Sequence, residues 1–408
     1  MPTADPFDAA AFDFGLLSPA TAGHDDAVSD PAVLLAIVEV EIAYLRVLEN
    51  AGIAPTGSAS AAADAAGPIA SDLVDLARRS TLGGNPVIPL LAGLRSGLPA
   101  DVAAWVHRGA TSQDILDTAL MLTARRARDE TIESLDAAVA SLARLAEEHR
   151  GTVAAARTLT QHSTPTTWGL RFAIWLGAVL DARDALAAVK LPAQLGGASG
   201  TLAALVELAG AQTAARVPAL LAAELGLDDS RPWHTSRSPV TRLGGALTEV
   251  VDALGVIAAD VATMSRTEIA EVVEPAAQGR GGSSAMPQKR NPVLSVLIRS
   301  TALRAPGLLA TLHLCAASAV DERPDGAWHA EWPTLRELLR LALGASGLAA
   351  ELAAGLTVDT EKALANLAIT GEDILAERRA VSGVVGDPAD YTGLASDFID
   401  VTLRRARP

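Results

Sequence analysis

The chain lacks several features that would place it in other protein classes. Its 408 residues include a single cysteine, Cys315, which excludes an intrachain disulfide and a cysteine-cluster metal site. A reducing, cytoplasmic compartment is therefore expected. Aromatic residues make up 3% and charged residues 20% of the chain, against 50% hydrophobic residues, so two or three domains with a large buried core are expected.

Positive charge is also scarce. The chain has 33 Lys and Arg against 48 Asp and Glu, a formal net charge of −15, which argues against binding to nucleic acid or to an anionic membrane. The first residues do not form a secretion signal, and the apolar runs are interrupted before about 20 residues, so no membrane partner is expected. An anionic substrate would have to meet cations concentrated at one place.

Strand signals are nearly absent, and helical signals are strong. From Leu243 to Met264, apolar residues recur at alternating steps of four and three, which is the pattern of a long helix packed against other helices. Shorter seams run from Ile132 to Leu142 and from Leu170 to Leu186. The pattern predicts an all-α protein, and because such apolar seams need partners, it also predicts an obligate oligomer.

The spacing of these signals predicts three regions. Shorter helices are expected over residues 1–100, a central bundle of long helices over 101–340, and a short helical tail over 341–408. Polar loops punctuated by glycine or proline separate the long seams, and these loops hold the candidate site residues.

The most informative loop is "GGSSAMPQKRNP" at residues 281–292. It combines two flexible glycines with the hydroxyls of Ser283 and Ser284, the cation Lys289 and the amide of Asn291. Such a loop can close over an anionic substrate and bring a hydroxyl to a reacting carbon while the cation holds a carboxylate. A solvated connector between helices is the alternative.

This stretch resembles the signature of the fumarase/aspartase superfamily, G-S-S-x-M-P-x-K-x-N, at every specified position. The resemblance implies an all-α fold of three domains with a central long-helix bundle, and a homotetramer whose active sites combine residues of several subunits. It implies cleavage of bonds beta to a carboxylate with no cofactor and no metal. By position, Ser283 matches the proton-abstracting base, and Lys289 and Asn291 match ligands of the substrate carboxylate.

A second loop, "GATSQD", resembles another conserved region of the superfamily. There Thr111, Ser112 and Gln113 would hydrogen-bond substrate oxygens near a helix N-terminus. The alternative is an ordinary capping segment, because Thr or Ser before an acidic residue is a common N-cap. Asp114 is expected to be structural.

The third loop, at residues 157–167, departs from most of the superfamily. Where Arg-Thr-His is usual, this chain has Arg157, Thr158 and Leu159, with His162 three places later. The bacterial 3-carboxy-cis,cis-muconate cycloisomerases look like this. Arg157 and Thr158 are therefore candidate substrate-binding residues and His162 a candidate catalyst, since an imidazole can transfer protons near neutral pH.

Further stretches share the likeness to this group. Arg323 matches an arginine near the group's substrate, and Trp175 is a candidate pocket residue. His234 and His329 stand beside tryptophans, where a structural role is as plausible as a functional one. Near the C-terminus, "ILAE" and "DPADYTG" follow each other almost directly, so a shortened third domain is expected.

The resemblance implies a cytoplasmic, cofactor-independent cycloisomerase of a tricarboxylate substrate. In that reaction, a carboxylate of 3-carboxy-cis,cis-muconate adds to a double bond of the same molecule and forms 4-carboxymuconolactone. His162 or Ser283 would transfer the proton. The alternative is another superfamily lyase acting on a succinate derivative, such as an adenylosuccinate, aspartate or nitrosuccinate lyase. An inactive helical oligomer is a third possibility, but it predicts a damaged signature loop, and this loop is intact.

Overall fold

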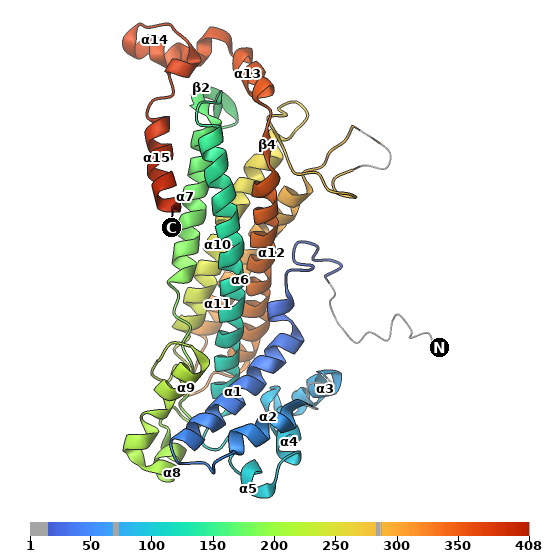
Figure 1. Cartoon of the computed structure of the whole chain (residues 1–408), viewed down its shortest axis with the longest axis vertical. Coiled ribbons are helices and arrows are strands. Elements are labelled where there is room, and N and C mark those ends of the chain that lie inside the picture. Colours follow the sequence, from blue (N-terminus) through green and yellow to red (C-terminus); the bar gives the residue numbers. More distant parts are fainter. Residues whose placement is uncertain (1–14, 68–72, 283–285, 287, 408) are drawn as a thin grey trace, which may run out of the picture.

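Long helices lie side by side along the long axis of the molecule (Figure 1). The computed structural model describes residues 15–67, 73–282, 286 and 288–407. The prediction of a mostly helical fold with long core helices is confirmed. The bundle consists of α6 (Ser112–Glu148), α7 (Trp168–Ala187), α10 (Ser238–Met264), α11 (Val293–Ala317) and α12 (Gly326–Gly355).

The seam of α10 is buried within the chain itself. Every apolar position that defines it is at most 6% exposed, and α10 packs against α7, α11 and α12. This differs from the expectation that the seam needs other subunits, because the neighbouring bundle helices of the same chain already cover it. The seam residues are Leu243, Leu247, Val250, Leu254, Ile257, Val261 and Met264.

Helix α11 is the bundle helix whose apolar side chains are least covered. By length and composition alone, α11 and α12 could each span a membrane, and their most apolar windows are 28% and 67% buried in the bundle, respectively. In α11 the exposed side chains of Val296, Leu303 and Leu314 are spaced by whole numbers of helical turns and so form one stripe. A single chain leaves this stripe uncovered.

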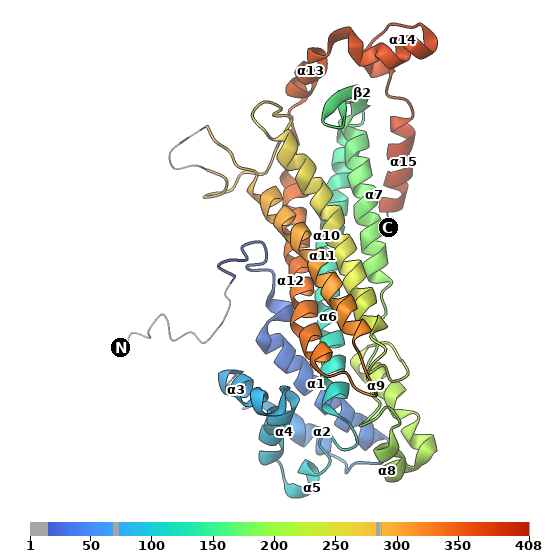
Figure 2. The same cartoon turned by 180° about the vertical axis from the view of Figure 1, so that it is seen from behind.

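The end of the bundle where α6 begins, called the lower end here, is surrounded by shorter helices (Figure 2). Helix α1 packs against α6 and α9, and α2 packs against α1. The lower-end elements are η1 (Asp26–Val28), α1 (Asp30–Asn50), α2 (Ser58–Ala66), α3 (Leu73–Gly83), α4 (Val87–Ser96), α5 (Ala100–Ala103), α8 (Ala203–Ala214) and α9 (Val217–Leu225).

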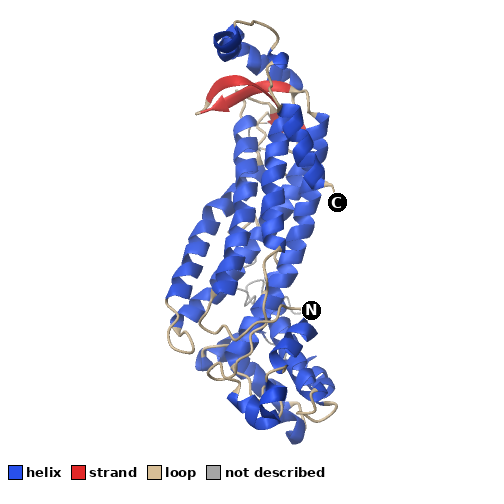
Figure 3. Cartoon of the chain, turned by 90° about the vertical axis from the view of Figure 1, so that its left-hand side faces the viewer, coloured by secondary structure: helices blue, strands red, loops and turns tan. Residues whose placement is uncertain are grey.

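The upper end carries a β-hairpin that projects from the bundle (Figure 3). The segment expected to be a loop forms antiparallel strands because Leu159 and Thr160, both at positive φ, make a two-residue turn between them. Helix α15 then runs back along α7. The upper elements are β1 (Val153–Thr158), β2 (Gln161–Thr167), β3 (Val272–Val273), β4 (Thr357–Val358), α13 (Thr360–Ile369), η3 (Gly371–Leu375), α14 (Ala376–Ser382), η4 (Pro388–Asp390) and α15 (Ala395–Ala406).

One expected region boundary falls inside a helix. The boundary between residues 340 and 341 lies within α12, whose buried apolar positions continue from Leu335 to Leu352 without a break. The bundle therefore extends to Gly355, and the helical tail begins after β4.

Candidate active site

The predicted site residues of one chain lie at opposite ends of the bundle. Thr111 immediately precedes α6, and Arg157 follows it on β1. Because α6 has 37 residues at 1.5 Å per residue, its two ends are about 55 Å apart. The geometry therefore separates the predicted residues of one chain into a lower group and an upper group (Figure 1).

In the lower group, two predicted residues meet directly. The guanidinium of Arg323 donates from Nη1 to the Thr111 hydroxyl at 2.6 Å and from Nη2 to the Ala198 carbonyl at 2.9 Å. Thr111, Arg323 and the neighbouring Ser112 are all half-buried. This places a cation and two hydroxyls at the N-terminus of α6, where the helix dipole also favours an anion.

Asp114 holds the segments of the lower group together. Its carboxylate accepts from the backbone N–H groups of Thr111, Gly196 and Gly197, at 2.9 to 3.0 Å, and pairs with Nε2 of His234 at 2.9 Å. The side chain is fully buried. This agrees with the structural role expected for Asp114, and it ties the loop after residue 194 to the start of α6.

Gln113 is part of the packed framework. The side chain is buried, and its amide nitrogen donates to Asp117 and to the backbone carbonyl of His234. Its amide oxygen has no hydrogen-bond partner among the described residues. A contact between Gln113 and the substrate stays a prediction.

One turn further along α6, Asp117 belongs to a buried network of charges. Arg237 forms a double hydrogen bond to Asp117, at 2.7 and 3.0 Å, and is paired on its other side with Glu331. Trp328 donates its indole N–H to Asp117. Burial alone would lower the pKa of Arg237, but the two carboxylates hold it above its usual value. Burial raises the pKa of Glu331.

In the upper group, the hairpin is fixed at its base and exposed at its tip. His162 pairs through Nδ1 with the Thr370 hydroxyl at 2.7 Å, and Thr158 is exposed. Arg157 donates to the fully buried Glu271, so this predicted substrate ligand is engaged in an ion pair within the chain. Leu159, at the tip, is 96% exposed.

The signature loop is closed at its base by Gly281 and Asn291. The Gly281 carbonyl accepts from the backbone N–H of Asn291 at 2.9 Å and from its side-chain amide at 3.2 Å. A Cβ at Gly281 would lie 2.7 Å from the Asn291 carbonyl oxygen, so this approach requires glycine. Lys289 is exposed, and Ser283 lies outside the described residues.

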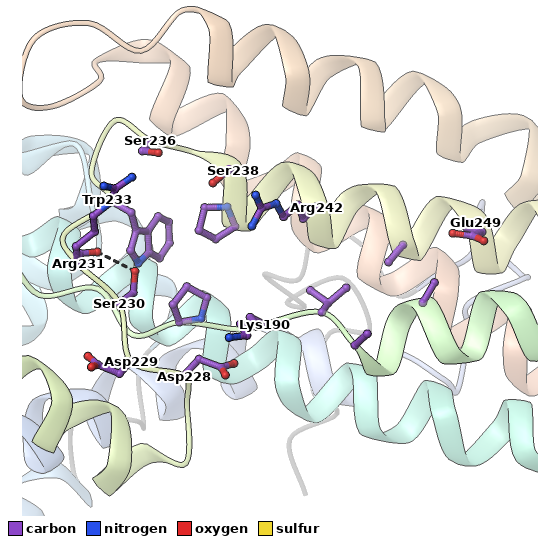
Figure 4. Close-up of a pocket in the computed structure, with 16 residues that line it drawn as sticks. Lys190, Asp228, Asp229, Ser230, Arg231, Trp233, Ser236, Ser238, Arg242 and Glu249 are labelled. Carbon is purple, nitrogen blue, oxygen red and sulfur yellow. Dashed lines mark hydrogen bonds between the residues drawn. The ribbon is translucent and has the colours of Figure 1, made fainter.

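A separate cleft of about 630 Å³ lies between the end of α7 and the start of α10 (Figure 4). Lys190, Arg242 and Trp233 are among the residues that line it, and no predicted site residue does. Trp233 separates this cleft from the buried framework, since His234, the next residue, pairs with Asp114 instead. The cleft is thus distinct from the lower group.

Other candidates have structural partners. Trp175 is buried and donates to Asp260, and His329 contacts the backbone carbonyls of Asp325 and Gly84. Within the described ranges, no group of three or more His, Cys, Asp or Glu side chains could hold a metal ion. Sequence reasoning missed the network of Asp117, Arg237 and Glu331, because one sequence does not reveal which charged residues are buried.

Comparisons of sequence find similar proteins with several activities. A nitrosuccinate lyase from Streptomyces davaonensis is 50% identical over 383 residues, which cover 91% of this chain and 81% of that protein. A 3-carboxy-cis,cis-muconate cycloisomerase from Pseudomonas aeruginosa is 40% identical over 361 residues, covering 87% of this chain and 77% of that protein. The chain is thus similar over most of its length to both.

Comparisons of structure and of family patterns agree with this. The crystal structure of the 3-carboxy-cis,cis-muconate lactonizing enzyme from Pseudomonas putida matches with a TM-score of 0.87 and 32% identity, over 96% of this chain and 99% of that one. Residues 77–307 match the family model described as lyase. The chain is therefore an enzyme that belongs to this lyase family, within the fumarase/aspartase superfamily.

Proposed function

We propose that the chain is a lyase that acts on a succinate derivative, with nitrosuccinate as its substrate. The observation that carries the proposal is the 50% identity to a nitrosuccinate lyase over 91% of the chain, against 36 to 40% for the cycloisomerases. A lyase of this kind was the alternative to the cycloisomerase reaction in the sequence analysis.

The reaction is an elimination that needs no oxidant or reductant. A base takes a proton from the carbon next to the nitro-bearing carbon, and the electrons of that C–H bond form the double bond. The C–N bond breaks, and its electron pair leaves with the nitro group as nitrite. The products are fumarate, nitrite and a proton on the base. Because nitrite is a stable anion, the leaving group requires no protonation.

The residues have distinct roles in this proposal. Ser283 removes the proton, as the superfamily resemblance implies, and Lys289 and Asn291 hold the carboxylate on which negative charge develops. Thr111, Ser112 and Arg323 bind the oxygens at the other end of the substrate. Cations placed where charge develops contribute the largest share of such catalysis. His162 is the alternative base for this proton, and the reaction uses no metal or cofactor.

A homotetramer completes the site in this proposal. The lower and upper groups of one chain are separated by the length of α6, so a complete site needs the lower group of one chain and the upper groups of others. The uncovered stripe of α11 supports subunit contact there. A mass of four chains by light scattering is expected, in a cytoplasmic protein.

The second candidate is the cycloisomerase reaction. It is favoured by the TM-score of 0.87 to the lactonizing enzyme and by the non-histidine residue Leu159 after Arg157 and Thr158. In that reaction the same cations would stabilise the charge that forms when a carboxylate adds to the diene of a tricarboxylate.

One pair of assays separates the candidates. The purified protein is given nitrosuccinate, with nitrite measured colorimetrically and fumarate by chromatography, and separately 3-carboxy-cis,cis-muconate, with loss of diene absorbance measured. We expect equal amounts of nitrite and fumarate and no lactone. Loss of the diene without release of nitrite would replace the proposal by the second candidate.

A further inference from the structure

His234 forms a buried pair with Asp114 beside the lower group. Nε2 of the imidazole lies 2.9 Å from a carboxylate oxygen, and the two side chains are 5% and 0% exposed. The pair stands apart from the proton carriers named above, since His162 lies on the hairpin at the other end of α6.

The other partners of Asp114 determine which imidazole nitrogen carries the proton. Three backbone N–H groups donate to the carboxylate, from Thr111, Gly196 and Gly197. A carboxylate that accepts from donors on both oxygens is deprotonated, so Nε2 of His234 must donate to it. The Nδ1 atom is then left for another partner, and among the described residues only Nε2 of this ring has a hydrogen bond.

The surroundings of the ring place Nδ1 close to the segment that binds Arg323. A Cβ at Gly200 would lie 3.8 Å from Nδ1, whereas a Cβ at Gly196 would lie 2.6 Å from Cε1. Gly196 thus packs directly against Cε1, and Gly200 lies on the Nδ1 side of the ring. Between these glycines, the Ala198 carbonyl accepts from Arg323.

We propose that His234 is a substrate-binding residue whose Nδ1 hydrogen-bonds an oxygen of the dicarboxylate substrate held by Thr111 and Arg323. Asp114 acts as the positioning residue: it fixes the ring through Nε2 and, through Thr111 and the glycine segment, aligns the other groups. An imidazole that donates from Nε2 to Asp114 and carries a second proton on Nδ1 can donate from Nδ1 to an anionic substrate oxygen. The inference rests on the proposed function, which supplies the dicarboxylate.

Two substitutions distinguish this role from a purely structural one. In His234→Gln, the amide nitrogen occupies approximately the position of Nε2, so the bond to Asp114 is kept and Nδ1 is lost. In His234→Asn, the amide nitrogen occupies approximately the position of Nδ1, and the bond to Asp114 is lost. His329→Gln is the matched control, since both ring nitrogens of His329 hydrogen-bond to backbone carbonyls.

The experiment measures the binding of fumarate, the product of the proposed reaction, to the intact protein by calorimetry, together with melting temperatures. We expect His234→Gln to melt like the wild type and to bind fumarate about 10- to 100-fold more weakly, as for loss of a hydrogen bond to a charged group. His234→Asn should melt at a lower temperature but keep more of the affinity. His329→Gln should bind like the wild type.

Each remaining outcome decides the matter. Wild-type affinity in His234→Gln would overturn the inference, because His234 would then serve only to support Asp114. If His234→Gln does not fold, the fumarate affinity of His234→Asn is compared with that of Thr111→Val, which removes the hydroxyl bound by Arg323. An equally large loss of affinity in His234→Asn would contradict the role of Nδ1. If the wild type binds fumarate more tightly than His234→Gln but releases no nitrite from nitrosuccinate, the proposed reaction fails and the inference stands. A wild type that binds no fumarate overturns both.

Discussion

The two ends of the bundle differ in how completely one chain builds them. At the lower end, Arg323 and Thr111 are already in contact, and Asp114 connects them to the glycine segment. At the upper end, Lys289 is exposed and the hairpin tip at Leu159 projects from the bundle. The lower end is preorganised by buried polar contacts, whereas the upper end presents its groups outward.

This difference indicates how the two ends depend on assembly. Folding of one chain is sufficient to align the lower group, because its partners are all internal. In the proposed homotetramer, the upper groups have a substrate to contact only when another chain brings its lower end to them. Substitutions in the buried contacts of the lower end should therefore affect folding as well as catalysis, and substitutions of exposed side chains in the signature loop should affect catalysis alone.

The largest effect is expected for Arg237→Met. This change leaves Asp117 and Glu331 buried without their cation, so the free energy of unfolding should fall by about 3 to 5 kcal/mol. Urea denaturation measures it. Arg46→Met is the control, because its pair with Glu224 is exposed and should contribute only about 0 to 1 kcal/mol. Equal losses in the two variants would mean that the lower end is not held by its charge network.

Lys289→Met should have the next largest effect, and on activity alone. It removes a cation from the position where negative charge develops, so kcat/KM should fall by about 10²- to 10³-fold, as for loss of one stabilising donor. Because Lys289 is exposed, the melting temperature of the Lys289→Met variant should equal that of the wild type. Arg290→Met, at the neighbouring exposed position, is the control. Turnover of Lys289→Met near that of the wild type would place the signature loop outside the active site.

His162→Gln should lower kcat by about 10²-fold, the lower limit for losing a group that acts on the substrate proton. Thr370→Val removes only the partner of Nδ1 and should have a smaller effect. NMR can follow the exchange with deuterium of the proton on the carbon next to the nitro-bearing carbon. If Ser283 is the base, this exchange should stop in Ser283→Ala and persist in His162→Gln. The reverse ranking would make His162 the base.

Thr160→Gly should have the smallest effect. Thr160 has a φ of +71°, which costs a β-branched residue about 1 to 2 kcal/mol, and glycine adopts this conformation without strain. The hairpin should gain up to about 1 kcal/mol, seen as slower hydrogen exchange of β1 and β2 amides. Gly383→Ala introduces a side chain at another positive-φ position, so hydrogen exchange of the α14 amides should become faster. Faster exchange in Thr160→Gly would contradict the assigned strain.

The long helices could be predicted from the sequence because a regular seam requires a helix. The spacing from Leu243 to Met264 indicated α10, and the structure buries these positions. The sequence could not predict which chain covers this seam. The spacing of apolar residues shows which face of a helix is buried, but it does not show which helices pack against that face. The covering helices come from the same chain, and the exposed apolar stripe lies on α11 instead.

The hairpin and the charge network could not be predicted for different reasons. The turn at Leu159 and Thr160 lacks the Asn-Gly or Asp-Gly pair that usually marks a two-residue hairpin. Asp117, Arg237 and Glu331 are separated by about a hundred positions each and meet only through the bundle. The contact between Thr111 and Arg323, in contrast, joins two residues that the resemblance had already placed near the substrate.

Sharing of the active site between chains is tested most directly by mixing two inactive variants. Lys289→Met and Arg323→Met, each with its own affinity tag, are coexpressed, and assemblies that carry both tags are purified. Lys289→Met with Asn291→Ala is the control, because both changes damage the same loop. The account predicts that the first pair regains turnover well above either parent while the control pair does not. Mixed assemblies of Lys289→Met and Arg323→Met that remain as inactive as their parents would contradict it.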